Sequence, residues 1–227
     1  MRAPISVVIP TLDAAKVLPA CLGALVEGVQ ADLIREVIIS DGGSQDGTGQ
    51  LAEGWGAEVV IGAPSRGGQL RRGCAVAQGD WLLVLHADTV LAPGWAAAVQ
   101  SHMAHHTAAA GWFHLRFDHG GVAARVVASW ANLRSRMGLP YGDQGLLLSR
   151  ALYEAVGGYS DQPLMEDVAL AGALRGRLRA LQAVAVTSAE KYRRQGWLRR
   201  GGRNLWTLIR YMMGVPPAKL AEAYRKA

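Results

Sequence analysis

The hydrophobic residues of the first part of the chain fall into short runs separated by longer segments of mixed polarity. Four such runs, each bounded by polar residues, cover residues 5–9, 37–40, 57–61 and 81–85. Short apolar runs of this kind are typical of strands buried on both faces of a parallel sheet. Apolar residues recur at helical spacing over residues 14–26, and residues 66–79 continue as a loop and a helix. Strands that alternate with helices predict an α/β fold with a mostly parallel sheet and right-handed connections.

The pattern becomes more varied after residue 88. Further strands are predicted at residues 108–117, 146–148 and 178–187. Helices are predicted at residues 93–106, 122–137 and 150–156, from residue 165, and over most of 197–224 with an interruption at 215–217. The chain shows no internal repeat and no low-complexity linker. A mixed sheet around one core is therefore expected, and 227 residues suit a single domain of this kind.

Two of the predicted strands end on residues that could bind a nucleotide. Residues 81–85 are followed by His86, Ala87 and Asp88, and residues 37–40 are followed by the Gly-rich stretch from Asp41 to Thr48. In open α/β sheets, ligands bind outside the carboxyl ends of the strands. A histidine and a carboxylate there could hold a metal ion or a phosphate, and the Asp41 carboxylate could accept a base N–H. The alternatives are a ligand-free turn at Asp41 and a merely hydrogen-bonded histidine at the end of a strand.

Acidic residues also occur at the start of the helix that is predicted from residue 165. Glu166 and Asp167 are adjacent there, and Asp143 lies in the loop before the strand at 146–148. One carboxylate of such a pair can take a proton from a substrate while its neighbour orients the site. Adjacent acids at the start of a helix are also ordinary capping residues, because the helix macrodipole favours negative charge there. Both interpretations of the pair stay open.

Charge is distributed unevenly along the chain. Lys and Arg number 24 against 18 Asp and Glu, which gives a net charge of +6. Residues 168–221 contain eleven basic residues and one acid, Glu190, so this segment carries +10 and the remainder about −4. Such a segment suggests a phosphate-bearing partner: a nucleotide diphosphate or an anionic membrane surface, with nucleic acid less expected. With no apolar run long enough to span a bilayer, we expect a cytoplasmic protein that is at most peripheral to the inner membrane face.

The basic segment includes an amphipathic helix. Residues 197–213 place apolar side chains on one side of the helical wheel, with Arg199, Arg200, Arg203 and Arg210 mostly elsewhere. This arrangement fits a helix that lies in a membrane interface. It fits equally a helix whose apolar side packs on the rest of the domain.

Taken together, these motifs resemble the family 2 glycosyltransferases of the GT-A fold. The resemblance covers nearly the whole chain, through the ordered occurrence of residues 7–11 with Asp13, 37–48, 66–79, 86–88, 157–159 and 166–167. The sequence looks closest to the small subset of these enzymes encoded near radical-SAM and arsenosugar-type genes. The resemblance implies a GT-A domain over residues 1–195, with a nucleotide-binding half at 1–90 and an acceptor half at 91–195, followed by a basic helical tail at 196–227.

The resemblance also implies roles for particular residues. The donor would be a nucleotide-diphosphate sugar, expected to be a UDP-sugar, bound by Pro10, Thr11, Asp13, Asp41, Gly42, Gly43, Arg66, Gln69, Arg71, Ala87 and Asp88. A divalent metal, Mn²⁺ or Mg²⁺, would be held by Asp88 and His86. Asp167 would be the general base of an inverting transfer, assisted by Glu166, with Asp143 as a second candidate. Arg66, Arg71 or the Arg193–Arg194 pair would help to neutralise the diphosphate. The acceptor would be a small or lipid-linked molecule of unknown identity.

The sequence departs from the family pattern in two places. His86 stands at the first position of the usual Asp-x-Asp, and the residues after the first strand are Leu12, Asp13 and Ala14 in place of the common Asn-Glu. A neutral imidazole is a poor Mg²⁺ ligand but can bind Mn²⁺, so the metal and the nucleoside stay open. Two alternative functions are a sugar-phosphate nucleotidylyltransferase and a non-enzymatic basic module that binds membrane or nucleic acid.

Overall fold

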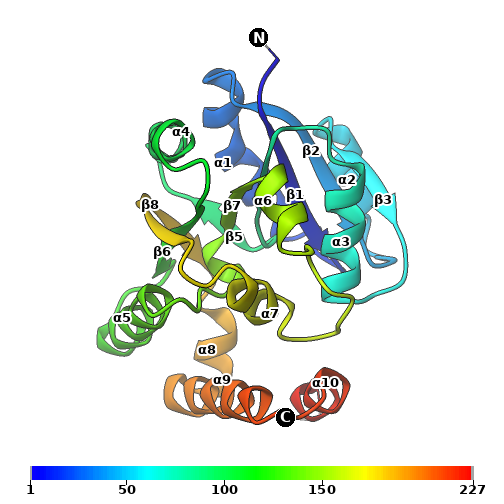
Figure 1. Ribbon diagram of the computed structural model, residues 1–227. Helices are drawn as coiled ribbons and strands as arrows, with labels where there is room; N and C mark the ends of the chain where they lie inside the picture. Colours follow the sequence, from blue (N-terminus) through cyan, green and yellow to red (C-terminus); the bar gives the residue numbers. More distant parts are fainter. Residues whose placement is uncertain (1, 226–227) are drawn as a thin grey trace.

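The computed structural model describes residues 2–225, which fold around one mixed sheet (Figure 1). The sheet has eight strands in the order β3-β2-β1-β4-β7-β6-β8-β5. Their bounds are β1 Ile5–Thr11, β2 Ile34–Asp41, β3 Glu58–Ile61, β4 Trp81–Val84, β5 Thr89–Leu91, β6 Ala110–Phe117, β7 Leu146–Ser149 and β8 Leu178–Thr187. The predicted α/β class with a mixed, mostly parallel sheet is confirmed.

The first four strands bring the predicted nucleotide-binding residues to one edge of the sheet. β1 is parallel to both β2 and β4, and β2 is parallel to β3. Thr11 at the end of β1 is paired with Asp41 at the end of β2. Because the chain leaves all four strands on the same side, the loops that follow Thr11, Asp41 and Val84 lie together at the carboxyl edge.

The other half of the sheet changes direction at β7. β7 is antiparallel to both β4 and β6, and β6 is parallel to β8. The short strand β5 pairs antiparallel with β8 at the edge of the sheet. The sequence did not predict β5, because a strand of three residues is too short to show an alternating pattern.

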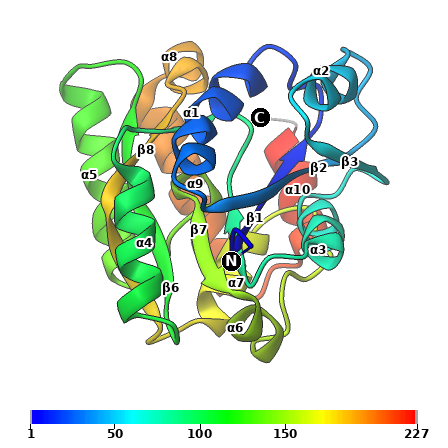
Figure 2. The same ribbon diagram turned by 90° about the horizontal axis from the view of Figure 1, so that it is seen from above.

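Helices cover both faces of the sheet, as Figures 1 and 2 show. Their bounds are α1 Leu18–Gln30, α2 Thr48–Gly54, α3 Arg66–Val76, α4 Trp95–His105, α5 Val122–Arg136, α6 Arg150–Ala155, α7 Glu166–Ala173, α8 Glu190–Gln195, α9 Trp197–Met212 and α10 Pro217–Arg225. One buried cluster joins α1, α2 and α4 to the sheet, and another joins α3, α6 and α7 to it. None of these helices is long and apolar enough to span a membrane.

Helix α1 begins later than the predicted start at residue 14. It starts at Leu18, with a proline in its first turn, and runs to Gln30. The amides of Ala14 and Ala15 are used elsewhere, because they donate to the side chains of Thr48 and Asp46 at 2.9 Å each. These bonds tie the loop after β1 to the loop after β2, and the helix begins beyond this loop.

The basic tail packs on the rest of the domain through one side. Leu208 of α9 and Leu220 of α10 share a buried cluster with Leu164 and Val168 of the α7 region. Trp197 packs edge-on against Phe117 of β6, with ring centroids 5.0 Å apart. The predicted break is present between α9 and α10, whereas α8 was not predicted. The packing interpretation of the tail therefore holds for its inner side.

Helix α3 is docked closely on the loop that precedes α7. A Cβ atom added to Gly67 would lie 2.0 Å from the carbonyl oxygen of Ser160. The Gly67 amide donates to the Gln162 carbonyl at 3.0 Å, and the Ser65 hydroxyl donates to Asp161 at 2.7 Å. This docking fixes the start of α3, where Arg66 lies.

We predict that Gly67→Ala destabilises the protein, because the added methyl group collides with backbone atoms that cannot move independently. The free energy of unfolding should fall by about 1–3 kcal/mol. Gly172→Ala is the matched control, since Gly172 also lies in a helix but an added Cβ would meet nothing within 4 Å. It should leave stability unchanged or raise it by up to about 1 kcal/mol. Urea unfolding of both variants measures the difference, and equal stabilities would show that the contact is unimportant.

Candidate active site

A cavity of about 130 Å³ opens at the carboxyl edge of the sheet, between the strand ends and the tail. Its walls come from the loop after β4, the ends of β6 and β8, α7, the loop before β7 and the helices of the tail. The lining residues are Arg66, His86, Asp88, Phe117, Tyr141, Gly142, Asp143, Leu164, Met165, Asp167, Thr187, Ser188, Lys191, Tyr192, Arg200, Asn204 and Tyr224. Five residues predicted from separate motifs, Arg66, His86, Asp88, Asp143 and Asp167, are thus brought to one cavity.

Gly142 connects the end of β4 to the start of α7. A Cβ atom at this position would lie 2.3 Å from Nε2 of His86, so the imidazole ring packs directly on the glycine backbone. The Gly142 amide donates to Oδ2 of Asp167 at 2.9 Å. One residue without a side chain therefore fixes the position of His86 and of the Asp167 carboxylate.

The segment around Gly142 is itself held by a buried amide side chain. Gln144 is fully buried; its Oε1 accepts from the Ser135 hydroxyl of α5 at 2.5 Å, and its Nε2 donates to the Phe113 carbonyl of β6 at 3.3 Å. The guanidinium of Arg134 lies 3.2 Å from the centre of the Tyr141 ring. The loop is thus anchored to α5 and β6, and Gly142 stays in place without help from a ligand.

The backbone before α7 adopts an uncommon conformation. It places Glu166 and Asp167 in different surroundings. Met165 has a φ of 65°, in the left-handed region that a residue with a side chain rarely enters. After this turn Asp167 lines the cavity, whereas Glu166 is buried outside it, with 1% of its surface exposed. Neither carboxylate oxygen of Glu166 accepts a hydrogen bond from another residue. Glu166 therefore makes no capping hydrogen bond, whereas Oδ1 of Asp167 accepts from the Val168 amide in the first turn of α7 at 2.8 Å.

Three groups around the cavity have strongly shifted pKa values. Burial, reinforced by the Asp167 carboxylate, raises the pKa of Glu166 to about 7. Burial also raises the pKa of Asp143 to about 6, with Asp167 and Asp88 adding to the shift and Arg134 opposing it. Burial lowers the pKa of His86 to about 4, and the nearby Arg66 lowers it further. His86 is therefore neutral at pH 7, with a ring nitrogen able to bind a metal ion or a proton donor.

Arg66 contributes positive charge to the same cavity. Its pKa is raised although burial works against the charge, because the carboxylates of Glu166, Asp167 and Asp88 favour it. A guanidinium also forms strong paired hydrogen bonds to phosphate oxygens. Arg71 and the Arg193–Arg194 pair, which were predicted to share this task, do not line the cavity.

The predicted nucleoside-binding residues form a separate hydrogen-bonded unit beside the cavity. Asp41 accepts from the Thr11 hydroxyl at 2.7 Å, from the Gly43 amide at 2.8 Å and from the Ser44 amide at 2.7 Å. Burial alone would raise the pKa of Asp41, but bonds from Ser44 and Thr11 outweigh it and lower the pKa. The Gln69 amide donates to the Thr11 carbonyl at 2.7 Å. Asp41 thus shapes this loop, and its contact with a base stays a prediction.

The remaining predicted donor residues belong to the same edge without reaching the cavity. Asp13, with a φ of 49°, accepts from the Gln45 amide at 2.9 Å and so joins the two loops. The predicted residues that do not line the cavity are Pro10, Thr11, Asp13, Asp41, Gly42, Gly43, Gln69, Arg71, Ala87 and Glu166. Most of them lie at the ends of β1 and β2, where they could hold the part of a donor that extends out of the cavity.

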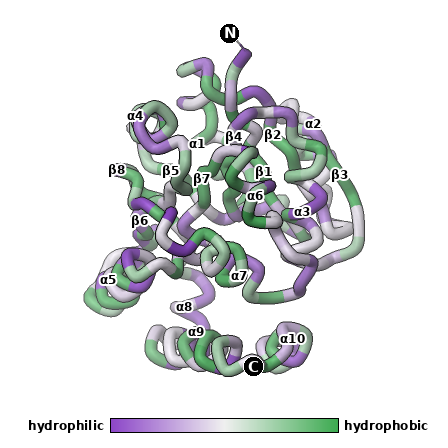
Figure 3. Tube along the Cα trace, in the orientation of Figure 1, coloured by the Kyte–Doolittle hydropathy of each residue, from purple (hydrophilic) through white to green (hydrophobic). Residues whose placement is uncertain are grey.

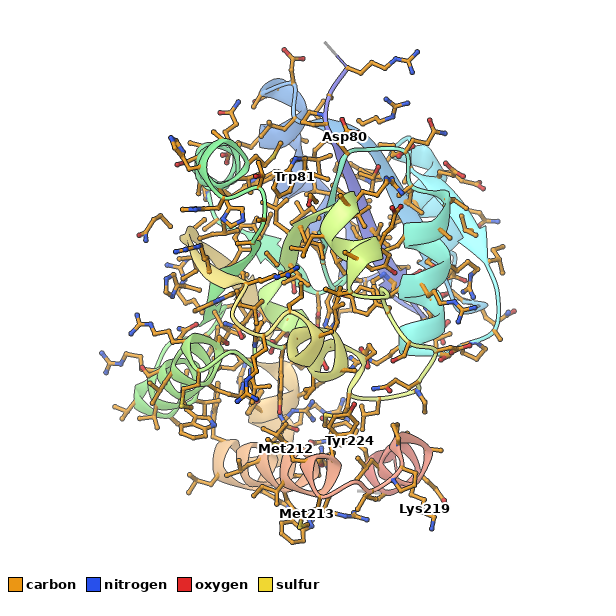
Figure 4. All side chains as sticks on the ribbon, in the orientation of Figure 1. Asp80, Trp81, Met212, Met213, Lys219 and Tyr224 are labelled. Atoms are coloured by element: carbon orange, nitrogen blue, oxygen red, sulfur yellow. The ribbon has the colours of Figure 1, made fainter. Side chains whose placement is uncertain are left out.

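The tail supplies lining residues that the sequence analysis did not assign to the site. Tyr224 of α10 donates its hydroxyl to Asn204 at 3.1 Å and accepts from Arg200 at 3.2 Å, and Asn204 also donates to Tyr192 at 3.1 Å. In Figure 4, Tyr224 points from α10 toward the rest of the domain. Arg200 and Asn204 are one helical turn apart on α9, a spacing that was available in the sequence. What it could not reveal was which side of α9 faces the site.

A family model and curated relatives match this chain. The model "Glycosyl transferase family 2" matches residues 6–149. Among curated proteins, the PGL/p-HBAD biosynthesis glycosyltransferases of Mycobacterium tuberculosis and Mycobacterium bovis are each 38% identical over 99 residues, which is 40% of this chain. The match spans 38% of the length of those relatives.

Solved structures share the fold over most of the chain. A mannosyltransferase from Pyrobaculum calidifontis, solved with GDP-Man and Mn²⁺, has a TM-score of 0.67 and 20% identity, and the match covers 99% of this chain and 70% of that one. Glucosyl-3-phosphoglycerate synthase from Mycobacterium tuberculosis, solved with Mn²⁺, UDP-glucose and phosphoglyceric acid, has a TM-score of 0.58 and 21% identity, with 82% of this chain and 70% of that one covered.

The family model covers the strands and loops that carry His86 and Asp88, and it ends at β7, just after the loop that carries Asp143. The matched region contains the complete parallel half of the sheet with its carboxyl edge. By its sequence and its fold, the chain belongs to glycosyl transferase family 2.

Proposed function

We propose that the protein transfers a sugar from a nucleotide-diphosphate sugar, expected to be a UDP-sugar, to an acceptor hydroxyl with inversion at the anomeric carbon. The observation that supports this most is the meeting of Asp88, at the end of β4, with Asp167, at the start of α7, in one cavity. A transferase needs charge control at the leaving diphosphate and a base at the acceptor, and these two acids come from the two halves of the chain.

Donor binding is assigned to the edge formed by β1, β2 and β4. The nucleoside would lie against the unit built from Thr11, Asp13 and Asp41, where the glycines after Asp41 leave the backbone accessible. The diphosphate would extend toward Asp88, within reach of Arg66. Both solved neighbours named above bind a nucleotide sugar and Mn²⁺, which supports a donor of the same chemical class here.

A divalent metal fits the residues at the end of β4. Asp88 offers carboxylate oxygens and His86 a neutral ring nitrogen, and Oδ1 of Asp143 is buried without a hydrogen-bond partner. Within residues 2–225, no group of three or more His, Cys, Asp or Glu is arranged to hold a metal alone. Diphosphate oxygens would therefore complete the coordination, as is usual for Mg²⁺ and Mn²⁺ sites with nucleotides. When bound, the ion neutralises negative charge on the leaving group.

Asp167 is assigned as the general base because it lines the cavity and its neighbour Glu166 does not. The pKa of Glu166, about 7, also leaves about half of this carboxyl protonated at pH 7. Asp167 faces the cavity and is oriented by the Gly142 amide. In the transfer, the acceptor oxygen bonds to the anomeric carbon, Asp167 takes the hydroxyl proton, and the bond from that carbon to the diphosphate oxygen breaks to release the nucleoside diphosphate.

The acceptor is assigned to the side of the cavity that the tail provides. Tyr192 and Tyr224 supply aromatic surface, and Lys191, Arg200 and Asn204 supply hydrogen-bond donors. Such a wall suits a hydroxylated small molecule or the head group of a lipid-linked one. We expect the reaction to take place in the cytoplasm.

Donor and metal should stabilise the protein jointly. We expect the thermal unfolding midpoint to rise with UDP or a UDP-sugar plus Mn²⁺ by more than the sum of the separate shifts, because each ligand completes the site of the other. GDP- and ADP-sugars are the controls for the nucleoside. Additive shifts with every nucleotide would count against a metal-assisted donor site.

Substitution of the two cavity acids should cause different defects. Asp88→Asn should lose the Mn²⁺-dependent part of UDP binding together with turnover, because a charged ligand is removed. Asp167→Asn should keep UDP and Mn²⁺ binding but lose turnover by ~10² or more, the usual scale for a general base. Calorimetry measures binding, and UDP release with an acceptor measures turnover. Wild-type turnover in Asp167→Asn would disqualify it as base, and Asp143 would be tested next.

Glu166 should make stability depend on pH. Below about 4.5 the carboxyl is neutral in both the folded and the unfolded protein. As the pH rises from there to about 7, the unfolded chain loses this proton while the folded protein keeps it, so the free energy of unfolding falls. Glu166→Gln removes this loss of stability, so the gain in the free energy of unfolding at pH 8, relative to pH 4.5, should be about 3 kcal/mol. Turnover should stay within about tenfold of wild type, since glutamine resembles the protonated acid.

The control for Glu166 is Glu154→Gln, which changes an exposed glutamate on α6. Urea unfolding at several pH values should show no such difference for this variant. An equal response of the two variants would mean that Glu166 does not hold its proton in the folded protein.

A further inference from the structure

Two helices at the tail end of the molecule expose continuous apolar stripes. On α5 the stripe consists of Val122, Val126, Trp130, Leu133 and Met137, spaced at one helical turn. On α9 it consists of Leu198, Leu205, Trp206, Ile209, Met212 and Met213. Leu198 is 88% exposed and Trp206 57% exposed. Isolated exposed apolar residues are ordinary, but rows of large side chains on one helix side mark an interaction site.

The stripe on α9 cannot be covered by the domain to which it belongs. The opposite side of α9 is already occupied, because Thr207 and Leu208 are buried and Arg200 and Asn204 line the cavity. On a helical wheel the stripe is centred roughly opposite these inward residues. Figure 4 labels Met213 at the end of α9, at the lower margin of the molecule. The side that faces away from the site is thus apolar and without a partner within residues 2–225.

The two helices are neighbours. α5 contacts α9, and both views of the fold draw them close together at the same end of the molecule (Figures 1 and 2). Figure 3 shows hydrophobic residues along both helices there. We call the two stripes together the outer face.

The charges of the two helices identify the kind of partner. Neither α5 nor α9 contains an acidic residue, whereas α5 has three arginines and α9 has four. Arg125, Arg136 and Arg199 are exposed, and Arg210 is half-buried. A helix with an apolar side, tryptophan and arginine at its margins matches the composition of helices that lie in a lipid interface. The partner must therefore offer both an apolar layer and negative charge.

A second copy of the chain meets this requirement poorly. In a symmetric dimer the same patch contacts itself, so the arginines of both copies would surround one apolar contact with no acid on either helix to neutralise them. An anionic bilayer supplies hydrocarbon for the stripes and phosphate for the arginines. We propose that the outer face docks the protein on an anionic membrane surface, with Trp130 and Trp206 in the interface and Arg199 and Arg210 on lipid phosphates.

This docking would place the cavity close to the lipid surface. Arg200 and Asn204 face the cavity from the same helix whose opposite side carries the stripe, so one helix diameter, about 10 Å, separates the two. A lipid-linked acceptor could then reach the site from the membrane. The docking itself does not depend on the proposed reaction, and it can be measured without donor or acceptor.

The test is flotation of the full chain with vesicles of phosphatidylcholine alone and of phosphatidylcholine mixed with phosphatidylglycerol. We expect recovery with the anionic vesicles only, weaker at about 1 M than at about 0.1 M salt, because salt screens the arginines. Replacement of Arg199 and Arg210 by Gln should lower partitioning by about 25-fold, at about fivefold for each arginine near an anionic surface. Trp130→Gln combined with Trp206→Gln should lower it at least tenfold.

Matched controls change exposed apolar residues and basic residues away from the outer face. Trp55→Gln with Val29→Gln removes two exposed apolar side chains of the α1–α2 region, and Arg2→Gln with Arg35→Gln removes two positive charges near the opposite end of the sheet. These variants should float like wild type. Circular dichroism and thermal unfolding establish that every variant is folded, which is expected because none of the changed residues is buried.

Three outcomes would overturn the proposal. The first is no recovery with anionic vesicles, and the second is equal recovery with neutral ones. The third is an outer-face variant that floats like wild type but changes the oligomeric state in size-exclusion chromatography with light scattering. That last result would assign the face to contact between copies of the chain.

Discussion

The geometry of the candidate active site depends on Gly142, a residue without a side chain. The ring of His86 lies where a Cβ of Gly142 would be, and the amide of the same glycine donates to Asp167. Because one peptide group touches both residues, the end of the central strand β4 and the start of α7 cannot move apart without breaking this contact. The buried Gln144 extends the constraint to α5 and β6. The distance between the proposed metal-binding and proton-accepting groups is therefore set by backbone and buried amides, which hardly adjust.

The same region carries buried acids without complete hydrogen bonding. Both oxygens of Glu166 and Oδ1 of Asp143 lack partners, and an ionised carboxyl in such surroundings is costly. The raised pKa values of both groups follow from this cost, since the neutral form avoids it. Met165 adds a strained backbone directly before α7. Groups of this kind persist where surrounding packing fixes them, and they are more common at active sites than elsewhere. Features that are energetically unfavourable in themselves therefore cluster around Asp167.

Much of this arrangement could be predicted from the sequence, for a physical reason. Parallel strands end on one side of a sheet, so polar residues that follow buried runs, such as Asp41 and Asp88, had to lie at the same edge. Short or context-dependent features could not be predicted. β5 has too few residues to show a period, and the loop before α1 is held by hydrogen bonds to Thr48 and Asp46, which lie 34 and 31 positions away in the sequence. Nor does a sequence reveal that Glu166 is buried while Asp167 is not, since the turn at Met165 decides it.

For the basic tail, the side of the helix on which each charged residue lies is more informative than the number of charged residues. The segment from 168 to 221 carries +10, and the sequence allowed a nucleotide or a membrane as the partner of this charge. In the folded protein the two are not exclusive, because a helix presents different residues to different sides. Lys191 and Arg200 line the cavity, whereas Arg199 and Arg210 accompany the apolar stripe on the outside. One step along α9, from Arg199 to Arg200, turns a side chain by about 100°, so that Arg199 faces solvent and Arg200 faces the cavity. The tail can therefore be both a wall of the site and a surface for a second partner.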